Sequence, residues 1–173
     1  TIYRATNGHY WIAEQSAVVR WDGDRLKRFS FDKKNETKGY IHSFQFFEDQ
    51  YGRFFLTSQP GHMFVYIPQS ERFNELNILN KPQPFTIESV YYWPDRRVWL
   101  AGESGVFELN LTDISNDLKL EYVFAISDVQ FIQRGLYNDL LLATVGQGVF
   151  QVQKNVNQWI IKNMDELPVN VIN

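Results

Sequence analysis

Apolar residues along this chain fall in short runs separated by polar corners that are rich in Gly, Pro, Asn and Asp. Residues 54–57 (FFLT) follow a polar corner at 48–52, and a second corner at 58–61 leads into residues 63–66 (MFVY). Short apolar runs between turn residues predict β-strands. Because no segment of ten or more residues shows clean helical spacing, the pattern predicts strands joined by tight turns and almost no helix.

The same pattern recurs at nearly constant spacing. Phe55 lies 44 residues after Trp11, and Trp99 lies 44 residues after Phe55. In a fourth copy, residues 141–144 (LLAT), the Leu-Ala pair lies 42 residues after the pair at 100–101. Each copy is followed by a small residue or Gly and a further apolar strand. A repeat of this period that is built only of strands predicts the blades of a β-propeller.

We therefore predict an all-β fold, a β-propeller of four antiparallel blades with four strands each. The blades are expected at about 1–39, 40–85, 86–127 and 128–166, and residues 167–173 match the start of a further repeat. Trp11, Phe55 and Trp99 occupy one slot of the repeat, so we expect them in the core between blades. The strands are expected at 1–4, 10–13, 17–21 and 26–31; 41–47, 53–57, 62–67 and 72–76; 86–92, 97–101, 106–111 and 118–124; 129–132, 139–143, 149–153 and 158–162.

The sequence leaves open how the ring of blades closes. Thr1 aligns with the residue that would follow Asn173, so the chain corresponds to a whole number of repeats. Four blades rarely close tightly, and an open arc exposes two apolar blade faces, which are typical of association sites. We expect either part of a larger propeller of about seven or eight blades, completed by the remaining blades of the same protein, or two copies that meet as a homodimer.

Composition narrows the classes of partner. The net charge is −3, with acidic and basic residues interspersed, which argues against nucleic acid because phosphate binding needs clustered Lys and Arg. No apolar run approaches 18 residues, so the segment is not expected to span a membrane. The chain has no Cys, which excludes disulfides and thiolate metal sites. Aromatic residues make up 16% of the sequence, as suits sheets that stack face to face.

The repeats resemble a known family. Residues 48–57 (EDQYGRFFLT), 7–13 (NGHYWIA), 98–101 (VWLA) and 167–173 (LPVNVIN) carry the resemblance, and Gly-Val-Phe recurs at 105–107 and 148–150. In register they are similar to the two-component regulator propeller repeat, with a pattern of roughly Leu-Pro-x-Asn-x-Val-x-Ser-Ile, then Asp-x-x-Gly-x-Leu-Trp-Ile-Gly-Thr, then Gly-Leu. The chain departs from that pattern at Ala5, where Asp is usual; the third repeat lacks the turn Gly, and the fourth has Leu in place of Trp.

The resemblance covers essentially the whole chain and implies a function. It implies the sensor domain of a bacterial signalling protein, usually periplasmic, that is joined to a membrane helix and a cytoplasmic output module. The output would be a histidine kinase, a diguanylate cyclase or a transcription factor, none of which is contained in this sequence.

Catalytic and metal chemistry find little support. His9, His42 and His62 fall at different points of the repeat, so blade symmetry does not bring them together as metal ligands. The paired carboxylates lie in turns, where they usually accept hydrogen bonds from backbone N–H groups. Residues 102–105 (GESG) lie between strands and are not a Gly-x-Ser-x-Gly nucleophile turn. We therefore predict no enzyme activity, no metal and no cofactor in this segment.

A ring of polar turn residues is the candidate binding site. The repeat alignment places Gln15, Gln59 and Glu103 at one slot, and Gln147 falls in the same turn of the fourth blade. His42 and Glu88, near the starts of inner strands, would add to the rim. Amides and carboxylates around one mouth suit a hydroxyl-rich small molecule such as an oligosaccharide. The simpler alternative is that exposed turns collect polar residues whatever their role.

Three functions remain in contention at this point. The first is a ligand-sensing module that passes binding on to a membrane-attached output domain. The second is a non-catalytic scaffold for protein interactions, since propellers offer broad rigid faces. The third is a propeller lyase or hydrolase, which would need titratable groups that converge in one place.

Overall fold

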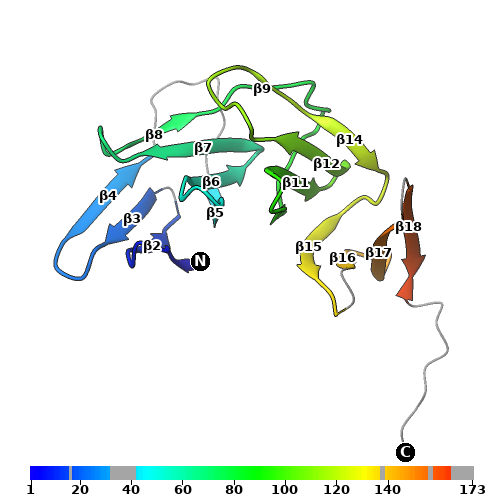
Figure 1. Cartoon of the computed structure of the whole chain (residues 1–173). Helices are drawn as coiled ribbons and strands as arrows, with labels where there is room; N and C mark the ends of the chain where they lie inside the picture. The colour runs from blue at the N-terminus through cyan, green and yellow to red at the C-terminus, as the bar shows by residue number, and fades with distance from the viewer. Residues whose placement is uncertain (16, 32–41, 137–138, 156–157, 165–173) are drawn as a thin grey trace, which may run out of the picture.

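The computed structural model describes residues 1–15, 17–31, 42–136, 139–155 and 158–164. Four sheets, each antiparallel and four-stranded, follow one another along the chain and lie in an arc (Figure 1). The predicted fold class, an all-β partial propeller, is confirmed. Residues 167–173, where the start of a further repeat is predicted, lie outside the described residues. So do residues 32–41, which include the end of the first predicted blade and the first residue of the strand predicted at 41–47, and the side chain of His42.

Strand order within each blade follows chain order, with the first strand on the concave side of the arc (Figure 1). Blade 1 has β1 (Ile2–Arg4), β2 (Tyr10–Ala13), β3 (Ala17–Trp21) and β4 (Leu26–Ser30). Blade 2 has β5 (His42–Glu48), β6 (Phe54–Gln59), β7 (His62–Ile67) and β8 (Arg72–Glu75). Blade 3 has β10 (Ser89–Tyr92), β11 (Arg97–Gly102), β12 (Gly105–Asn110) and β14 (Glu121–Phe124). Blade 4 has β15 (Val129–Arg134), β16 (Leu140–Thr144), β17 (Val149–Asn155) and β18 (Gln158–Asn163).

Blades stack through three apolar clusters, one at each seam of the arc. Trp11, Phe55 and Trp99 are each at most 1% exposed and face the next blade along the chain. The ring of Trp11 stacks on Phe54 of blade 2 at 4.4 Å between centroids, and Trp99 meets Trp159 of blade 4 at 4.7 Å. The predicted role of this slot as the core between blades is therefore confirmed.

The outer rim departs from the predicted strand at 118–124. The chain there forms two strands, β13 (Leu118–Lys119) and β14, and β13 pairs in parallel with β9 (Ile78–Leu79), which belongs to the segment after blade 2. Leu118 and Leu120 are both buried in the cluster between blades 2 and 3. The alternation of apolar residues was interpreted correctly, but the hydrogen-bonding partner of the first half lies 40 residues away, from Leu118 to Ile78.

The first strand of blade 3 is also shorter than the predicted 86–92. Regular pairing begins only at Ser89, opposite Ala101. Ile87 is nevertheless buried, at 1% exposure, because the segment that enters blade 3 packs into the seam with blade 2 before its backbone joins the ladder. Burial in this segment therefore does not indicate a strand.

Replacing a Trp between blades should cost far more than replacing one at the end of the arc. We expect Trp99→Ala to lower the free energy of unfolding by about 3–5 kcal/mol, because it leaves a cavity in a closed seam and removes the donor that reaches Glu108 Oε2 at 2.8 Å. Trp21→Ala is the matched control, measured at protein concentrations too low for self-association. Trp21 is 40% exposed on the side of blade 1 that faces away from blade 2, so its replacement should cost less than about 1.5 kcal/mol. Urea unfolding of both variants measures the difference, and equal losses would contradict the assigned seams.

Candidate functional site

The turns between second and third strands lie against the segments that join successive blades. Lys81 Nζ, in the connector before blade 3, donates to Gly61 O at 3.0 Å, and Glu103 N donates to Thr86 Oγ1 of the same connector at 3.1 Å. In the next connector Asp128 N donates to Glu103 O at 3.3 Å. We call the surface formed by the turns at 14–15, 60–61, 103–104 and 145–148, with the connectors 76–88 and 125–128, the connector face.

Two glycines allow this close approach. A Cβ on Gly61 would lie 2.5 Å from Phe85 Cδ1 and 2.7 Å from Phe85 O, and the backbone of Gly61 has φ +97°. A Cβ on Gly102 would collide with the carbonyl oxygen of Thr86. Any larger residue at either position would push the turn away from its connector. The connector before blade 3 is therefore packed against the turn of blade 2 at Gly61 and against the turn of blade 3 at Gly102.

Three of the predicted site residues come together at the seam of blades 2 and 3. Gln59 Nε2 donates to Glu88 Oε1, and Gln45 Nε2 donates to the backbone oxygen of Glu88. His42 lies directly opposite Gln59 in the ladder of β5 and β6. The sequence analysis predicted that His42, Gln59 and Glu88 share one rim of the propeller. The structure shows in addition that the side-chain amide of Gln59 donates a hydrogen bond to the carboxylate of Glu88.

The other three predicted residues lie in turns of separate blades. Gln147 Nε2 donates to Ser127 Oγ at 2.7 Å, so this amide fastens its turn to the connector before blade 4. The side chains of Glu103 and Gln15 are exposed. Among the six, Gln59, Glu88 and Gln147 therefore have partners within the protein, whereas Glu103 and Gln15 face solvent. Their role in binding stays a prediction.

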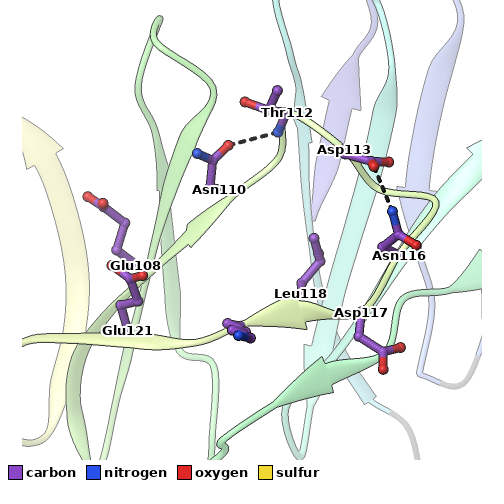
Figure 2. Close-up of a pocket in the computed structure, with 9 residues that line it drawn as sticks. Glu108, Asn110, Thr112, Asp113, Asn116, Asp117, Leu118 and Glu121 are labelled. Atoms are coloured by element: carbon purple, nitrogen blue, oxygen red, sulfur yellow. Dashed lines mark hydrogen bonds between the residues drawn. The ribbon is translucent and has the colours of Figure 1, made fainter.

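A cavity that the sequence did not predict lies over the outer half of blade 3 (Figure 2). It has a volume of about 380 Å³ and is lined by Glu108, Asn110, Thr112, Asp113, Asn116, Asp117, Leu118, Lys119 and Glu121. The sequence feature that could have indicated this cavity is the connection at 112–117, which is longer than its counterparts in the other repeats.

The polar groups of this cavity mainly hold the 112–117 loop. Asp113 accepts hydrogen bonds from Ser115 Oγ and N, at 2.6 and 2.9 Å, and from Asn116 Nδ2 at 2.7 Å, and these bonds, those from Ser115 first, lower the pKa of its carboxyl. Asp117 Oδ1 accepts from Asn77 Nδ2 at 2.9 Å and so ties the loop to the segment after blade 2. We therefore interpret these bonds as structural.

A second cavity, of about 210 Å³, lies at the seam of blades 1 and 2 and combines aromatic and charged side chains. Arg20 Nη1 donates to Tyr66 Oη at 2.6 Å, and its Nη2 lies 2.8 Å from Glu71 Oε1. Lys27 Nζ lies 2.5 Å from Glu71 Oε2. Hydrogen bonds from Lys27 and then Arg20 lower the pKa of Glu71, and burial raises the pKa of Tyr66. Two cations of blade 1 thus share one carboxylate of blade 2.

This shared carboxylate should make the seam sensitive to acid. A carboxyl whose pKa is lowered by folding stabilises the fold above its ordinary pKa of 4.5, and that contribution is lost as pH falls through and below this value. We expect Glu71→Gln to be less stable than wild type near neutrality and to lose less stability on acidification to about pH 3. Urea midpoints across this range measure the effect; Glu103→Gln, in an exposed turn, is the control and should follow the wild-type profile.

The bond between Gln59 and Glu88 predicts unequal effects of two similar truncations. Gln59→Ala removes the donor to a part-buried carboxylate and should lower the free energy of unfolding by about 1.5–3 kcal/mol. Glu103→Ala changes an exposed turn and should stay within about 0.5 kcal/mol of wild type. Calorimetric melting of both variants measures this, and a Gln59→Ala variant as stable as Glu103→Ala would show that the bond contributes nothing.

Within the described ranges, no group of three His, Asp or Glu side chains is placed to hold a metal ion. The same part of the chain contains no helix that is long and apolar enough to cross a membrane.

Comparison with solved structures finds similar folds. The extracellular domain of a hybrid two-component system of B. thetaiotaomicron, BT4673, matches 95% of this chain with a TM-score of 0.73 and 13% identity. That of a second such system, BT3049, matches 98% with a TM-score of 0.67 and 18% identity. Virginiamycin B lyase of Staphylococcus aureus matches 94% with a TM-score of 0.67 and 12% identity.

These matches differ in extent. The chain spans 25% and 23% of the two extracellular domains and 54% of the lyase. No model of a known protein family and no curated protein sequence matches the chain. Identities this low establish the fold alone, so the chain is a set of four β-propeller blades of the kind found in the extracellular domains of hybrid two-component systems.

Proposed function

We propose that this chain is a ligand-sensing, extracytoplasmic propeller module of a bacterial signal-transduction protein of the two-component regulator type. The observation that carries the proposal is the match of 95% of the chain to an extracellular domain of a hybrid two-component system. The resemblance of its repeats to the two-component regulator propeller repeat supports the same conclusion from the sequence alone. Fold does not imply function, so the proposal needs a ligand.

The location follows from the same argument. The matched domains are described as extracellular, and the propeller repeat family is usually periplasmic. We place this module in the periplasm, as the extracytoplasmic part of an inner-membrane protein whose output domain lies in the cytoplasm. Its partners would be a small-molecule ligand and either further blades of the same protein or a second copy.

We place ligand recognition on the connector face. Glu103 and Gln15 offer an exposed carboxylate and amide there. The hydrogen-bonded pair of Gln59 and Glu88 adds a fixed polar group at the seam of blades 2 and 3. Acceptors and donors held by bonded connectors suit a hydroxyl-rich ligand, because few placed polar groups set its orientation without reorganisation. An oligosaccharide is the class that we propose.

The alternatives differ in what they require. A scaffold would use the blade surfaces and would need no small molecule. A lyase or hydrolase, for which the similar fold of virginiamycin B lyase is the motive, would need a catalytic constellation on a face of the propeller. Turnover of virginiamycin B or of a sugar by the purified chain would favour the enzyme over the sensor.

Ligand binding should appear as thermal stabilisation. In a screen of oligosaccharides, a ligand at 100 times its Kd stabilises the folded state by about 2.7 kcal/mol, which corresponds to a rise in Tm of roughly 5–10 °C for a domain of this size. The double variant Gln15→Ala/Glu103→Ala should abolish the shift while keeping the melting temperature of the free protein. The matched control is Asp24→Ala/Gln69→Ala, which changes a carboxylate and an amide in exposed turns between third and fourth strands.

Two outcomes would contradict the proposal. If no oligosaccharide shifts the melting temperature, the sensing of this ligand class is wrong and the scaffold is favoured. If a ligand binds but the Gln15→Ala/Glu103→Ala variant retains wild-type affinity, ligand sensing stands and the connector face is not the site.

A further inference from the structure

The cavity at the seam of blades 1 and 2 lies on the edge of the propeller opposite the connector face. Its lining includes Asn7 from the turn between β1 and β2, Gly52 from the turn between β5 and β6, and Pro68, which follows β7. In an antiparallel sheet these turns lie at the other end of a blade from the turns between second and third strands. The cavity is therefore distinct from the ligand surface proposed above.

Aromatic rings form a preformed wall of this cavity. Trp11, Phe54 and Tyr66 line it, and each is at most 8% exposed. The ring of Trp11 stacks on Phe54 at 4.4 Å and meets Tyr66 edge-on at 4.9 Å between centroids. The volume of about 210 Å³ is smaller than the roughly 300–1,000 Å³ of drug-sized sites. The wall therefore suits a small molecule with a flat apolar body.

Arg20 stands at this seam where blade 3 has a carboxylate. Glu108 pairs with Trp99 across β11 and β12, and its Oε2 accepts from Trp99 Nε1 at 2.8 Å and from Arg97 Nη1 at 3.0 Å. Arg20 pairs in the same way with Trp11 across β2 and β3. A guanidinium contains donors only. At this slot, blade 1 therefore lacks the acceptor that Glu108 supplies in blade 3.

One donor of Arg20 has no partner in the described part of the chain. Its Nη1 donates to Tyr66 Oη at 2.6 Å and its Nη2 to Glu71 Oε1 at 2.8 Å, but its Nε is buried without an acceptor there. Buried donors are normally paired. Glu71 also binds Lys27 at 2.5 Å, so these three side chains together carry one net positive charge. The missing partner is therefore an acceptor, and a negative charge would suit it.

The other Arg and the one Glu of the lining are already paired. Glu48 accepts from Thr6 N at 2.7 Å and from Thr6 Oγ1 at 3.2 Å. Arg53 Nε lies 2.5 Å from Asp49 Oδ2. Among the described lining residues, the buried donor that lacks a partner belongs to Arg20.

We propose that this cavity binds a small carboxylic acid with a flat apolar body, such as an aromatic carboxylate. The body lies against the rings of Trp11, Phe54 and Tyr66. The carboxylate accepts from Arg20 Nε and so takes the part that Glu108 plays beside Trp99. Arg suits this role because hydrogen bonds between a guanidinium and a carboxylate are charge-assisted. Since both blades line the cavity, the acid also ties blade 1 to blade 2.

Calorimetric titration at neutral pH tests the class of ligand. Benzoate should bind about tenfold or more tightly than benzyl alcohol, which has the same ring but offers no charged acceptor to Arg20. Inorganic phosphate, an anion without an apolar body, should bind more weakly than benzoate. The proposal is overturned if benzoate does not bind, if benzyl alcohol binds as well, or if phosphate does.

Three substitutions test the contact with Arg20. Arg20→Gln removes the Nε donor and the charge and should weaken benzoate binding about tenfold or more. Glu71→Gln removes a negative charge beside Arg20 and should strengthen binding. Arg28→Gln is the matched control, because Arg28 pairs with Glu14 at 2.8 Å on the other side of blade 1, and it should leave the affinity unchanged. Wild-type affinity in Arg20→Gln, or equal weakening in Arg28→Gln, would contradict the contact.

Protection of a single Cys locates the acid without relying on the stability of an Arg20 variant. The chain has no native Cys. Pro68→Cys places a thiol in an exposed turn at the cavity, and Asp24→Cys places one in an exposed turn outside its lining. Saturating benzoate should slow alkylation of Pro68→Cys and leave Asp24→Cys unchanged. An unchanged rate at Pro68→Cys would show that benzoate binds elsewhere.

The same assay separates this site from the connector face. Gln15→Ala/Glu103→Ala, introduced into the Pro68→Cys variant, should retain the protection by benzoate, whatever the outcome of the oligosaccharide screen. Loss of the protection in that variant would place the acid on the connector face and overturn the proposal.

Discussion

The stacking of one blade's apolar face on the next is the interaction on which the rest of this structure depends. A four-stranded sheet with apolar residues on both sides cannot bury either side alone, so each blade is completed only by its neighbours. The slot of Trp11, Phe55 and Trp99 shows this directly, since all three are excluded from solvent by the following blade. On the sides of blades 1 and 4 that face away from the other blades, apolar side chains such as Leu26 and Phe131 are exposed.

Stacking also builds the connector face. Once two blades are in contact, the segment between them must cross from an outer to an inner strand over the turns of both blades. Gly61 and Gly102 allow that segment to touch the turns, and bonds from Gln59 to Glu88 and from Gln147 to Ser127 hold it there. The polar groups of this face are therefore positioned by the core beneath them, which is the condition for selective recognition without reorganisation.

A similar fold occurs in the extracellular domains of hybrid two-component systems and in a lyase, so the architecture leaves the activity open. What distinguishes the possibilities is the chemistry presented on the faces. Most polar groups around the cavity at blade 3 bond to their own loop or to the neighbouring segment, whereas Glu103 and Gln15 point to solvent from the connector face. This contrast is the reason for which we propose the connector face, rather than the cavity at blade 3, as the ligand-binding surface.

The sequence by itself determined the blades, the residues that stack between them and the face on which the turns gather. It could do so because side chains alternate with a period of two along a strand and because the repeats share one register, so equivalent positions have equivalent neighbours. Only the tertiary structure decided that Leu118 and Lys119 pair with Ile78 and Leu79, that Ile87 is buried outside a strand, and that Gln59 is bonded to Glu88. Each of these features depends on segments that are far apart in the chain and that the stacking of blades 2 and 3 brings together. A local sequence pattern does not show which distant segments will meet.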